Sequence, residues 1–383
     1  MAIVINGSGT VTGLAVGGLP DGTVDAGTLA TNSVDSAELV DGAVDDSHMA
    51  SIKGRKNLII NGGMNVWQRA TVFTGNQAGF KGADRWKCTY QDAGAIQQER
   101  VDYTSSTGDI YNSMKLTCTT SGSYANSIRF QYNLETADVV GLRGKTVTAS
   151  AYVKQLHSDS NFHNFGFQYS NSATDYAAFG SWTAANSAAY TSSLTVNSFV
   201  RISRTYTVPN DARSLCVFFD CQSDTGNTNA IIEIANIQLE VGSTATEFEH
   251  RSFGEELALC KRYYEKSFEY ETTPANGADT SSFLTSEGIT SASAVLWHAN
   301  NKHTVRYEVE KRIEPTVTRY GNSQGYWGYI NAATSPSGSN SAHVFHQHLL
   351  CNNNCTKTFE INNQVSGNPL WGVRGHWTAD AEL

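Results

Sequence analysis

Charged side chains are scarce in this chain: Asp, Glu, Lys and Arg make up only 16% of its 383 residues. The Lys and Arg residues are scattered and the formal net charge is −9, so no basic stripe could neutralise phosphate groups. We therefore expect no nucleic-acid partner. No run of about 18 apolar residues occurs, so we also expect no membrane insertion. The opening residues MAIVINGSGT lack the basic and apolar regions of a signal peptide, so we do not expect ordinary secretion.

Catalytic motifs are missing as well. The sequence has no G-x-S-x-G elbow, no phosphate-binding Walker loop and no H-E-x-x-H metal motif. Carboxylates are few, and no spacing among them singles out an acid/base pair. We therefore expect that the protein is not an enzyme. Seven cysteines are an odd number, here at irregular spacing, so we expect reduced, buried thiols.

Short polar and aromatic residues are abundant instead. The chain contains 33 Gly, 17 Tyr, 16 Phe and 7 Trp, and Ser, Thr and Asn are frequent. Short polar side chains disfavour helix interiors because they form hydrogen bonds with the nearby backbone. Aromatic and β-branched side chains suit the half-buried surface of a sheet. The composition therefore predicts an all-β protein with many turns.

A repeat of ten residues occupies the region 22–55. The units GTVDAGTLAT, NSVDSAELVD and GAVDDSHMAS align without gaps. Each unit offers two apolar positions, and these are Val24, Leu29, Val34, Leu39, Val44 and Met49. Two apolar side chains in ten residues cannot offset the entropy of ordering one chain. The region is therefore a flexible linker or a stem in which three copies wind together, and the regular spacing favours the intertwined homotrimer.

Period-two alternation of apolar residues dominates residues 56–250. Such runs, separated by Gly, Asn, Asp and Ser clusters, indicate about eight antiparallel strands and a jelly-roll β-sandwich. The runs include residues 114–118, 128–134, 147–153, 165–169, 200–206, 214–221 and 230–241. We expect the core to contain Trp67, Trp86 and the run 58–60.

Two acidic residues of this region have possible roles of their own. Asp84 could pair with another strand, and Glu240 could hold a structural calcium ion.

The opening NLIINGGMNVWQR…ADRW (57–86) and the closing IANIQLEVGSTATEFEHRSFGEELALCKRYYEKS (234–267) resemble the start and end of a domain of bacteriophage tail fibre proteins. The decads and the last residues, GHWTADAEL, also resemble parts of such fibres. The resemblance implies a carbohydrate-module-like, galactose-binding-like jelly roll, assembled as a homotrimer. It also implies synthesis in the host cytoplasm and a place in the tail of the virion.

This resemblance leads to a functional expectation. Residues 1–21 would attach to a phage tail or baseplate protein. The C-terminal region would act as the receptor-binding adhesin, recognising a glycan or protein of the host-cell surface. Two alternatives stay open: a spacer fibre that binds nothing, and a tailspike enzyme that degrades polysaccharide. Tailspikes usually carry a long repetitive β-helix, and residues 57–383 show no such period.

One helix is predicted within the linking segment 251–270. Ser252 and Glu255 fit a capping box, and Leu257, Cys260, Tyr263 and Tyr264 then follow at helical spacing. The pattern predicts a helix of about 12–15 residues, with Cys260 in the core rather than acting as a nucleophile.

Strand signals return in residues 271–383, which we expect to form a second, smaller β-sandwich at the receptor-binding tip. Aromatic rings can stack on the apolar faces of sugars, so exposed ones here are glycan-binding candidates. The candidates are Trp297, Tyr326, Trp327, Tyr329 and Trp371, whereas a core position is favoured for Trp377. His346 and His348 form an H-x-H pair beside two cysteines, which leaves open an axial transition-metal site in a trimer or an ordinary hairpin.

The stem hypothesis makes a prediction about mass. Because the decads cannot fold singly, we expect the purified full-length protein to have the mass of three chains in sedimentation or light scattering. A well-ordered single chain, stem included, would contradict the hypothesis.

Overall fold

The structure is a computed structural model, and it describes a defined part of the chain. Its described residues are 4–5, 11–12, 55–75, 78–90, 96–104, 110–119, 128–156, 161–172, 175, 184–188, 194–222, 230–270, 272–276, 302–320, 328–329, 349–352, 354–363, 373–374 and 376–382. Met1–Gly54 and Arg55–Leu383 form two separate units. In the first, β1 (Val4–Ile5) pairs antiparallel with β2 (Val11–Thr12). The six apolar decad positions lie outside the described residues.

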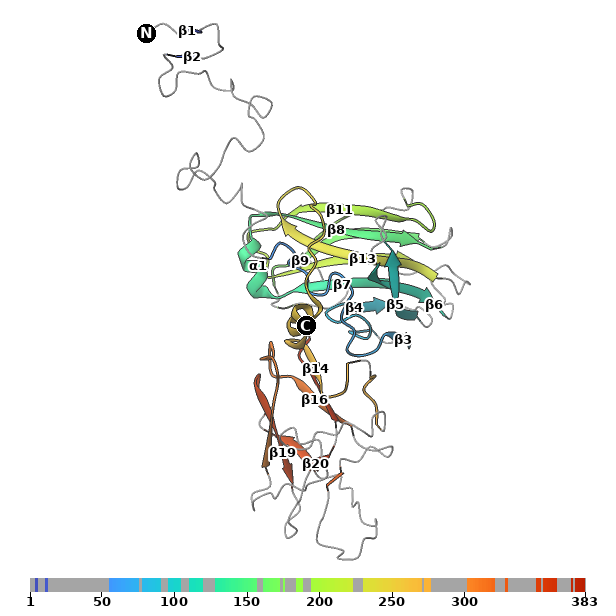
Figure 1. Cartoon of the computed structure of the whole chain (residues 1–383), viewed down its shortest axis with the longest axis vertical. Coiled ribbons are helices and arrows are strands. Elements are labelled where there is room, and N and C mark those ends of the chain that lie inside the picture. The colour runs from blue at the N-terminus through green and yellow to red at the C-terminus, as the bar shows by residue number, and fades with distance from the viewer. Residues whose placement is uncertain are drawn as a thin grey trace, which may run out of the picture. The chain divides into compact units, whose positions relative to one another are not determined.

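The second unit begins with a β-sandwich of two antiparallel sheets (Figure 1). The five-stranded sheet has the order β10 (Ala184–Ala188), β9 (Asn161–Ser170), β12 (Ser214–Gln222), β7 (Ile128–Leu134), β4 (Lys87–Tyr90). The six-stranded sheet has the order β11 (Phe199–Thr207), β8 (Thr146–Gln155), β13 (Ala230–Val241), β6 (Ile110–Cys118), β5 (Ile96–Thr104), β3 (Val72–Gly75). From β7 onward successive strands often alternate between the sheets, which is typical of a jelly roll.

The sandwich core follows from period-two patterning. In β12, Leu215, Val217 and Phe219 face the core, while the residues between them face the other side of the sheet. Trp86 stacks on Phe130 with ring centroids 4.7 Å apart. The predicted core positions are confirmed: Trp67, Trp86 and Ile59 are buried, and Leu58 and Ile60 pack against the same cluster.

The predicted strand segments match β6, β7, β8, β9, β11, β12 and β13, but the estimate of about eight strands is too low. The two sheets contain eleven strands in all, five and six. The sequence prediction missed β3, β4, β5 and β10, which are short or carry polar residues on both faces. It also missed α1 (Thr136–Leu142), whose seven residues are too few for a periodicity and bury Val139 and Leu142.

The motif NLIINGG forms a loop packed against β13. Asn61 has a left-handed backbone (φ 58°), and its side-chain amide donates hydrogen bonds to the carbonyls of Val66 and Asp84 (2.8 and 3.0 Å). Its carboxamide oxygen accepts from Val66 N (2.9 Å). A Cβ atom at Gly62 would lie 2.0 Å from the carbonyl oxygen of Ile237, so the close approach of the two backbones requires glycine there.

Helix α2 (Phe253–Lys261) follows the sandwich. Ser252 caps it as predicted, since its side chain accepts a hydrogen bond from Glu255 N, and Cys260 is buried as expected. The predicted length of 12–15 residues is wrong, because the helix has nine. It ends at Lys261 because Tyr264–Lys266 form strand β14, which pairs with a distant strand near residue 380.

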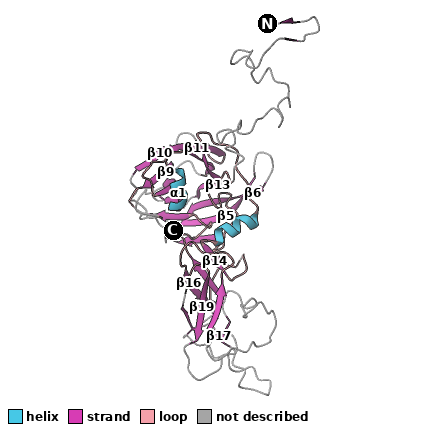
Figure 2. Cartoon of the chain, turned by 90° about the vertical axis from the view of Figure 1, so that its left-hand side faces the viewer, coloured by secondary structure: helices cyan, strands magenta, loops and turns pink. Residues whose placement is uncertain are grey.

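In the described part of the chain, strands dominate and helices are few (Figure 2).

In residues 264–382, here called the C-terminal lobe, the described part of the chain forms three small antiparallel sheets. They have the orders β14 (Tyr264–Lys266), β21 (His376–Asp380), β16 (Thr316–Tyr320); β15 (Lys302–Arg306), β19 (Thr358–Asn363), β18 (Leu349–Asn352); and β17 (Gly328–Tyr329), β20 (Val373–Arg374). A separate core lies between the first two sheets, formed by Val305, Tyr307, Phe359, Trp377 and Ala379. The lobe is therefore a small all-β packing with its own apolar centre.

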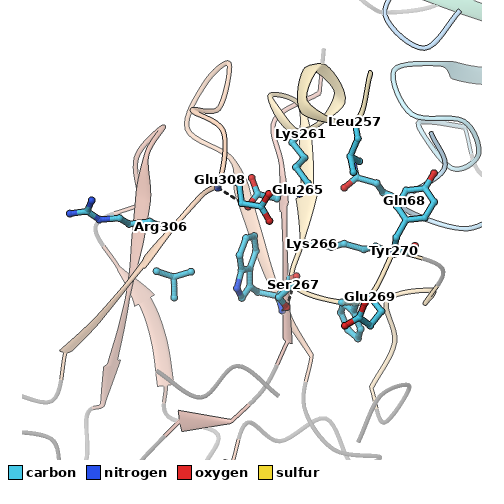
Figure 3. A pocket seen from close by; sticks show the side chains of 13 residues that line it. Gln68, Leu257, Lys261, Glu265, Lys266, Ser267, Glu269, Tyr270, Arg306 and Glu308 are labelled. Atoms are coloured by element: carbon cyan, nitrogen blue, oxygen red, sulfur yellow. Dashed lines mark hydrogen bonds and ion pairs between the residues drawn. The ribbon is translucent and has the colours of Figure 1, made fainter. Parts of the chain in front are cut away.

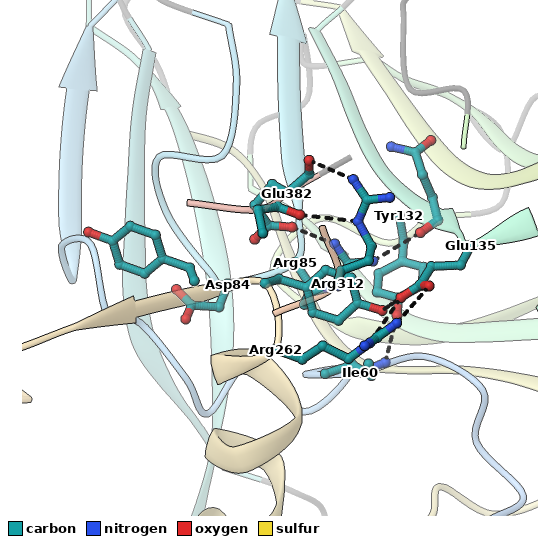
Figure 4. Close-up of polar contacts among 12 residues, drawn as sticks. Ile60, Asp84, Arg85, Tyr132, Glu135, Arg262, Arg312 and Glu382 are labelled. Carbon is teal, nitrogen blue, oxygen red and sulfur yellow. Dashed lines mark hydrogen bonds and ion pairs between the residues drawn. The ribbon is translucent and has the colours of Figure 1, made fainter. Parts of the chain in front are cut away.

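Ion pairs join the C-terminal part of the chain to the sandwich, and the pair at their centre is buried (Figure 4). The guanidinium of Arg85, from the ADRW motif, pairs with Glu382 and donates to the carbonyl of Asn133 (3.1 Å). Arg69 lies beside Asp380 (3.1 Å). A second cluster pairs Arg262, which follows α2, with Glu135 at the start of α1 (3.0 Å).

Arg312 of the lobe extends this junction. Its guanidinium pairs with Asp175 (2.8 Å) and donates to the carbonyls of Ala381 and Glu382 (3.1 Å each). Tyr263 donates its hydroxyl proton to Glu135 and stacks under Arg85, with 3.5 Å between the guanidinium carbon and the ring centroid.

Among the described residues no helix is long and apolar enough to cross a membrane.

The junction predicts an asymmetric response to charge removal. The Glu382→Ala change leaves the guanidinium of Arg85 buried without its carboxylate, which costs about 3–5 kcal/mol of unfolding free energy. The matched control is Glu310→Ala, because the Glu310–Lys357 pair (3.6 Å) is more than half exposed and contributes about 0–1 kcal/mol. Urea unfolding of both variants measures the difference, and equal losses would contradict the assignment.

Candidate functional site

The residues predicted to bind a glycan or a metal fall largely outside the described part of the chain. The predicted residues that lie there are Trp297, Tyr326, Trp327, Trp371, His346 and His348. Tyr329 lies in strand β17, of which only the backbone is described. These assignments therefore stay predictions. Cys355, from the same histidine–cysteine segment, is exposed, unlike the buried thiols that the sequence predicts and that five other cysteines confirm.

The described part of the lobe contains a pocket of about 320 Å³ beside α2, β14 and β15 (Figure 3). This volume is at the lower end of the range of small-molecule sites. Aromatic side chains and paired charges share the lining. It consists of Gln68, Leu257, Lys261, Glu265, Lys266, Ser267, Phe268, Glu269, Tyr270, Val305, Arg306, Glu308 and Trp377.

Ion pairs fix one wall of the pocket. Glu265 pairs with Lys311 in the interior and accepts a hydrogen bond from Glu308 N (3.0 Å). Burial lowers the pKa of Lys311, while the Glu265 carboxylate raises it. The side chain of Glu308 in turn pairs with Lys261 of α2. This wall is therefore already neutralised.

Lys266 and two aromatic rings form the next part of the lining. The ammonium group of Lys266 donates to the carbonyls of Tyr270 and Thr272 (2.7 Å each) and so closes the turn after β14. Phe268 is buried and stacks on His376 with ring centroids 4.1 Å apart. The turn therefore holds Phe268 and Tyr270 in place, and Glu269 between them is exposed.

Trp377 is buried in the lobe core, which confirms its predicted core position, and it also contributes to the pocket lining. Its ring meets Tyr307 and Phe359 edge-on, with centroids 5.6 and 5.3 Å apart. Its backbone N–H donates to Ser267 Oγ (2.8 Å). The indole Nε1, however, is buried and has no hydrogen-bond partner. A buried donor without an acceptor costs about 1–3 kcal/mol, so this atom lowers the stability of the lobe core.

Gln68 connects the pocket to the sandwich. Its side-chain amide donates to Asp84 Oδ2 (2.6 Å) and to the carbonyl of Tyr264 (2.8 Å). Burial raises the pKa of Asp84 to about 6, although the nearby Arg69 guanidinium and the hydrogen bond from Gln68 act in the opposite direction. Asp84 lies 3.6 Å from the guanidinium of Arg69, which belongs to the loop before β3, whereas the sequence had suggested a partner on another strand.

The outward face of the five-stranded sheet is polar but is not an open surface. Arg129 makes a two-pronged ion pair with Asp220 (2.7 and 2.8 Å) and lies 4.3 Å from the centroid of the Phe218 ring. All three residues are buried. This face therefore has a structural role within the described part of the molecule.

The carboxylate of Glu240, which the sequence suggested as a calcium ligand, accepts hydrogen bonds from its own chain. Its two carboxylate oxygens accept hydrogen bonds from Thr246 N (2.8 Å), Thr246 Oγ1 (2.6 Å) and Gln238 Nε2 (2.8 Å). Within the described residues, no group of three or more His, Cys, Asp or Glu side chains could hold a metal ion. The chemistry of Glu240 is thus that of a loop anchor.

No known protein-family profile matches the sequence, and no curated protein matches it. Similar solved structures include the enzymatically active domain of tailspike protein 4 from bacteriophage CBA120 (TM-score 0.32, 13% identity, 48% of this chain and 21% of that chain). They also include the CBM22-1 xylan-binding domain of Xyn10C from Paenibacillus barcinonensis (0.27, 17%, 46% and 99%) and a CBM4 structure (0.25, 18%, 41% and 87%). This chain thus spans about a fifth of the length of the tailspike domain.

The sequence prediction missed most of the pocket, although one local signal was present. In a chain with 16% charged residues, the segment KRYYEKSFEY (261–270) combines charges and aromatic rings at high density. The pocket brings this segment together with Gln68 and Trp377, which are far away in the sequence. Such an amphipathic lining can hold a small ligand that carries both apolar faces and hydrogen-bonding groups.

Asp84 predicts a specific pH dependence of stability. Its folded-state pKa of about 6 lies above the ordinary 3.8, so the folded protein binds the proton more tightly than the unfolded chain. Above pH 6 the folded protein therefore holds a charged carboxylate in its interior at a cost in stability. The free energy of unfolding rises as the pH falls through 6 towards 4. Relative to Asp84→Asn, the wild-type unfolding free energy should rise by roughly 2 kcal/mol between pH 7.5 and 4.5. Parallel curves in urea titrations across this range would contradict the assignment.

Proposed function

We propose that this protein is a non-catalytic, glycan-recognising fibre protein of a phage virion, and that its C-terminal lobe contacts the host surface. The observation that carries the proposal is the pocket of about 320 Å³ in the lobe, whose lining combines the partly exposed Tyr270 with the exposed, charged side chains of Glu269 and Arg306. Amphipathic pockets of this kind suit sugars, which present C–H faces and hydroxyl groups together. The family resemblance of the motifs at 57–86 and 234–267 supports the viral context.

The state of the carboxylates supports binding rather than hydrolysis. Glycoside hydrolysis generally requires two carboxyl groups on either side of the scissile bond. In this pocket Glu265 is tied to Lys311 and Glu308 to Lys261. Glu269 is exposed and lies on the turn after β14. Two of the three pocket carboxylates are therefore committed to lysines, which leaves no matched acid/base pair among the described lining residues.

The junction suits an adhesin because it fixes the lobe to the sandwich. Strand β14 follows α2 directly and carries Glu265, which pairs with the buried Lys311, and β21 leads to Glu382, which pairs with Arg85. A site built on such rigid elements has a defined geometry. Attachment to the tail through residues 1–21 and assembly as a homotrimer complete the proposal, since three copies would raise weak single-site affinity by multivalency.

The proposal predicts binding without cleavage. Purified full-length protein should bind immobilised lipopolysaccharide or capsular polysaccharide from some strains in a broad bacterial panel, and heat-denatured protein should not. Reducing ends should not increase with time in the same incubations. Their steady release would establish the tailspike enzyme instead, and absence of binding across the panel would favour the spacer fibre.

A further inference from the structure

We infer that the solvent-facing side of helix α2 is a contact surface for a second copy of this chain. The surface, here called the α2 face, consists of Phe253, Gly254, Leu257 and Ala258. The inference rests on the homotrimer of the proposed function and deepens it, because it names a surface through which the copies meet outside the stem.

The charged residues of α2 are all used within its own unit. Glu256 is buried, Glu255 pairs with Arg55, and Lys261 pairs with Glu308. An ordinary surface helix places its charges on the side that faces water. In α2 they are instead drawn into contacts beside and beneath the helix, so they do not solvate the α2 face.

The residues of α2 that face the solvent carry no charge. Phe253, Gly254 and Ala258 are exposed, and Leu257 is partly exposed. The side chain of Phe253 is 46% exposed, and in the described part of the chain it is the one aromatic among the exposed large apolar side chains. A helix that is apolar on its outer side as well as its inner side is typical of one covered on both sides.

The α2 face also has a shape that fits a copy of itself. Phe253 and Leu257 lie one turn apart in one row, and Gly254 and Ala258 lie in the next row. A Cβ atom at Gly254 would meet no atom within 4 Å, so this row is an open groove. Helices pack with the ridges of one in the grooves of the other. In a ring of identical copies, the Phe253–Leu257 ridge of each copy can therefore enter the groove of the next.

The course of the chain brings other copies to this face. The second unit begins at Arg55, whose guanidinium pairs with Glu255 of α2. Only residues 52–54 separate Arg55 from the last decad, and the four steps from residue 51 to residue 55 span at most about 14 Å. Three copies that wind together through the decads would therefore hold their α2 helices near one another at a high effective concentration. This connection makes a second copy the partner that the α2 face fits best.

The test crosslinks full-length protein that carries Cys355→Ser, a change that removes the exposed thiol of the described residues. Ala258→Cys then places a thiol on the α2 face, and Ser198→Cys places one at an exposed position of the loop before β11. With a short bifunctional maleimide, Ala258→Cys should yield about five times more covalent dimer than Ser198→Cys. Protein with Cys355→Ser alone measures crosslinking through the other cysteines.

A charge on the α2 face tests the contact itself. Phe253→Asp, combined with Ala258→Cys, should lower the yield of covalent dimer about tenfold, because the contact would bury an unpaired carboxylate. Aspartate is favourable in the first turn of a helix, so α2 should stay folded, and urea unfolding checks this. The control is Val140→Asp, at a 48% exposed position of the other helix, α1, which should leave the yield unchanged.

Light scattering on the same proteins before crosslinking separates this inference from the homotrimer. A three-chain mass with equal dimer yields from Ala258→Cys and Ser198→Cys, or a yield that Phe253→Asp does not lower, would overturn the inference and leave the homotrimer standing. The α2 face would then belong to another partner, such as a different tail protein. A single-chain mass would overturn both, while glycan recognition would still be judged by polysaccharide binding.

Discussion

The buried charge of Arg85 constrains the whole second unit. Its side chain is 1% exposed, and its backbone has a left-handed φ of 71°. Burial alone would lower its pKa, but the Glu382 carboxylate and the rings of Tyr132 and Tyr263 around it more than compensate. A buried guanidinium without a carboxylate would cost several kcal/mol, so the chain must bring Glu382 to this position. Strand β21, which precedes Glu382, is then held against β14.

Buried ion pairs of this kind are better explained by geometry than by stability. A well-packed apolar replacement is often as stable as a buried pair, because removing two charges from water offsets much of their attraction. Apolar contacts, however, tolerate several relative orientations. The buried pair Arg85–Glu382 and the partly exposed pairs Arg69–Asp380 and Arg262–Glu135 are satisfied together in one orientation. The scarcity of charge elsewhere in the sequence makes this concentration at one junction more informative. The junction sets the direction in which the lobe leaves the sandwich.

The sequence was a good guide to the sandwich because its strands have one apolar face. The alternation at 128–134 and 214–221 is visible in any single chain, and β7 and β12 lie there. It was a poor guide to β5, where IQQERVDYT offers few apolar positions, and to the end of α2. Tyr263 and Tyr264 continue the helical spacing, but Tyr264 pairs with Asp380, more than a hundred residues away. Local periodicity cannot reveal a partner so far away in the sequence. The helix therefore ends where this tertiary strand pairing begins, earlier than the periodicity predicts.

The pocket was harder to predict for a related reason. A sequence shows which charges exist but not which of them neutralise one another. Lys261, Glu265, Glu308 and Lys311 look like four independent candidates for chemistry, yet in the fold they form two ion pairs that build a wall. The lining residues outside these two pairs include two with exposed charged side chains, Glu269 and Arg306. Trp377, which also contributes to the lining, is buried against Tyr307 and Phe359 through the pairing of β21. The pocket is therefore a property of the packing of the lobe, and it exists only once the distant ends of the lobe are held together.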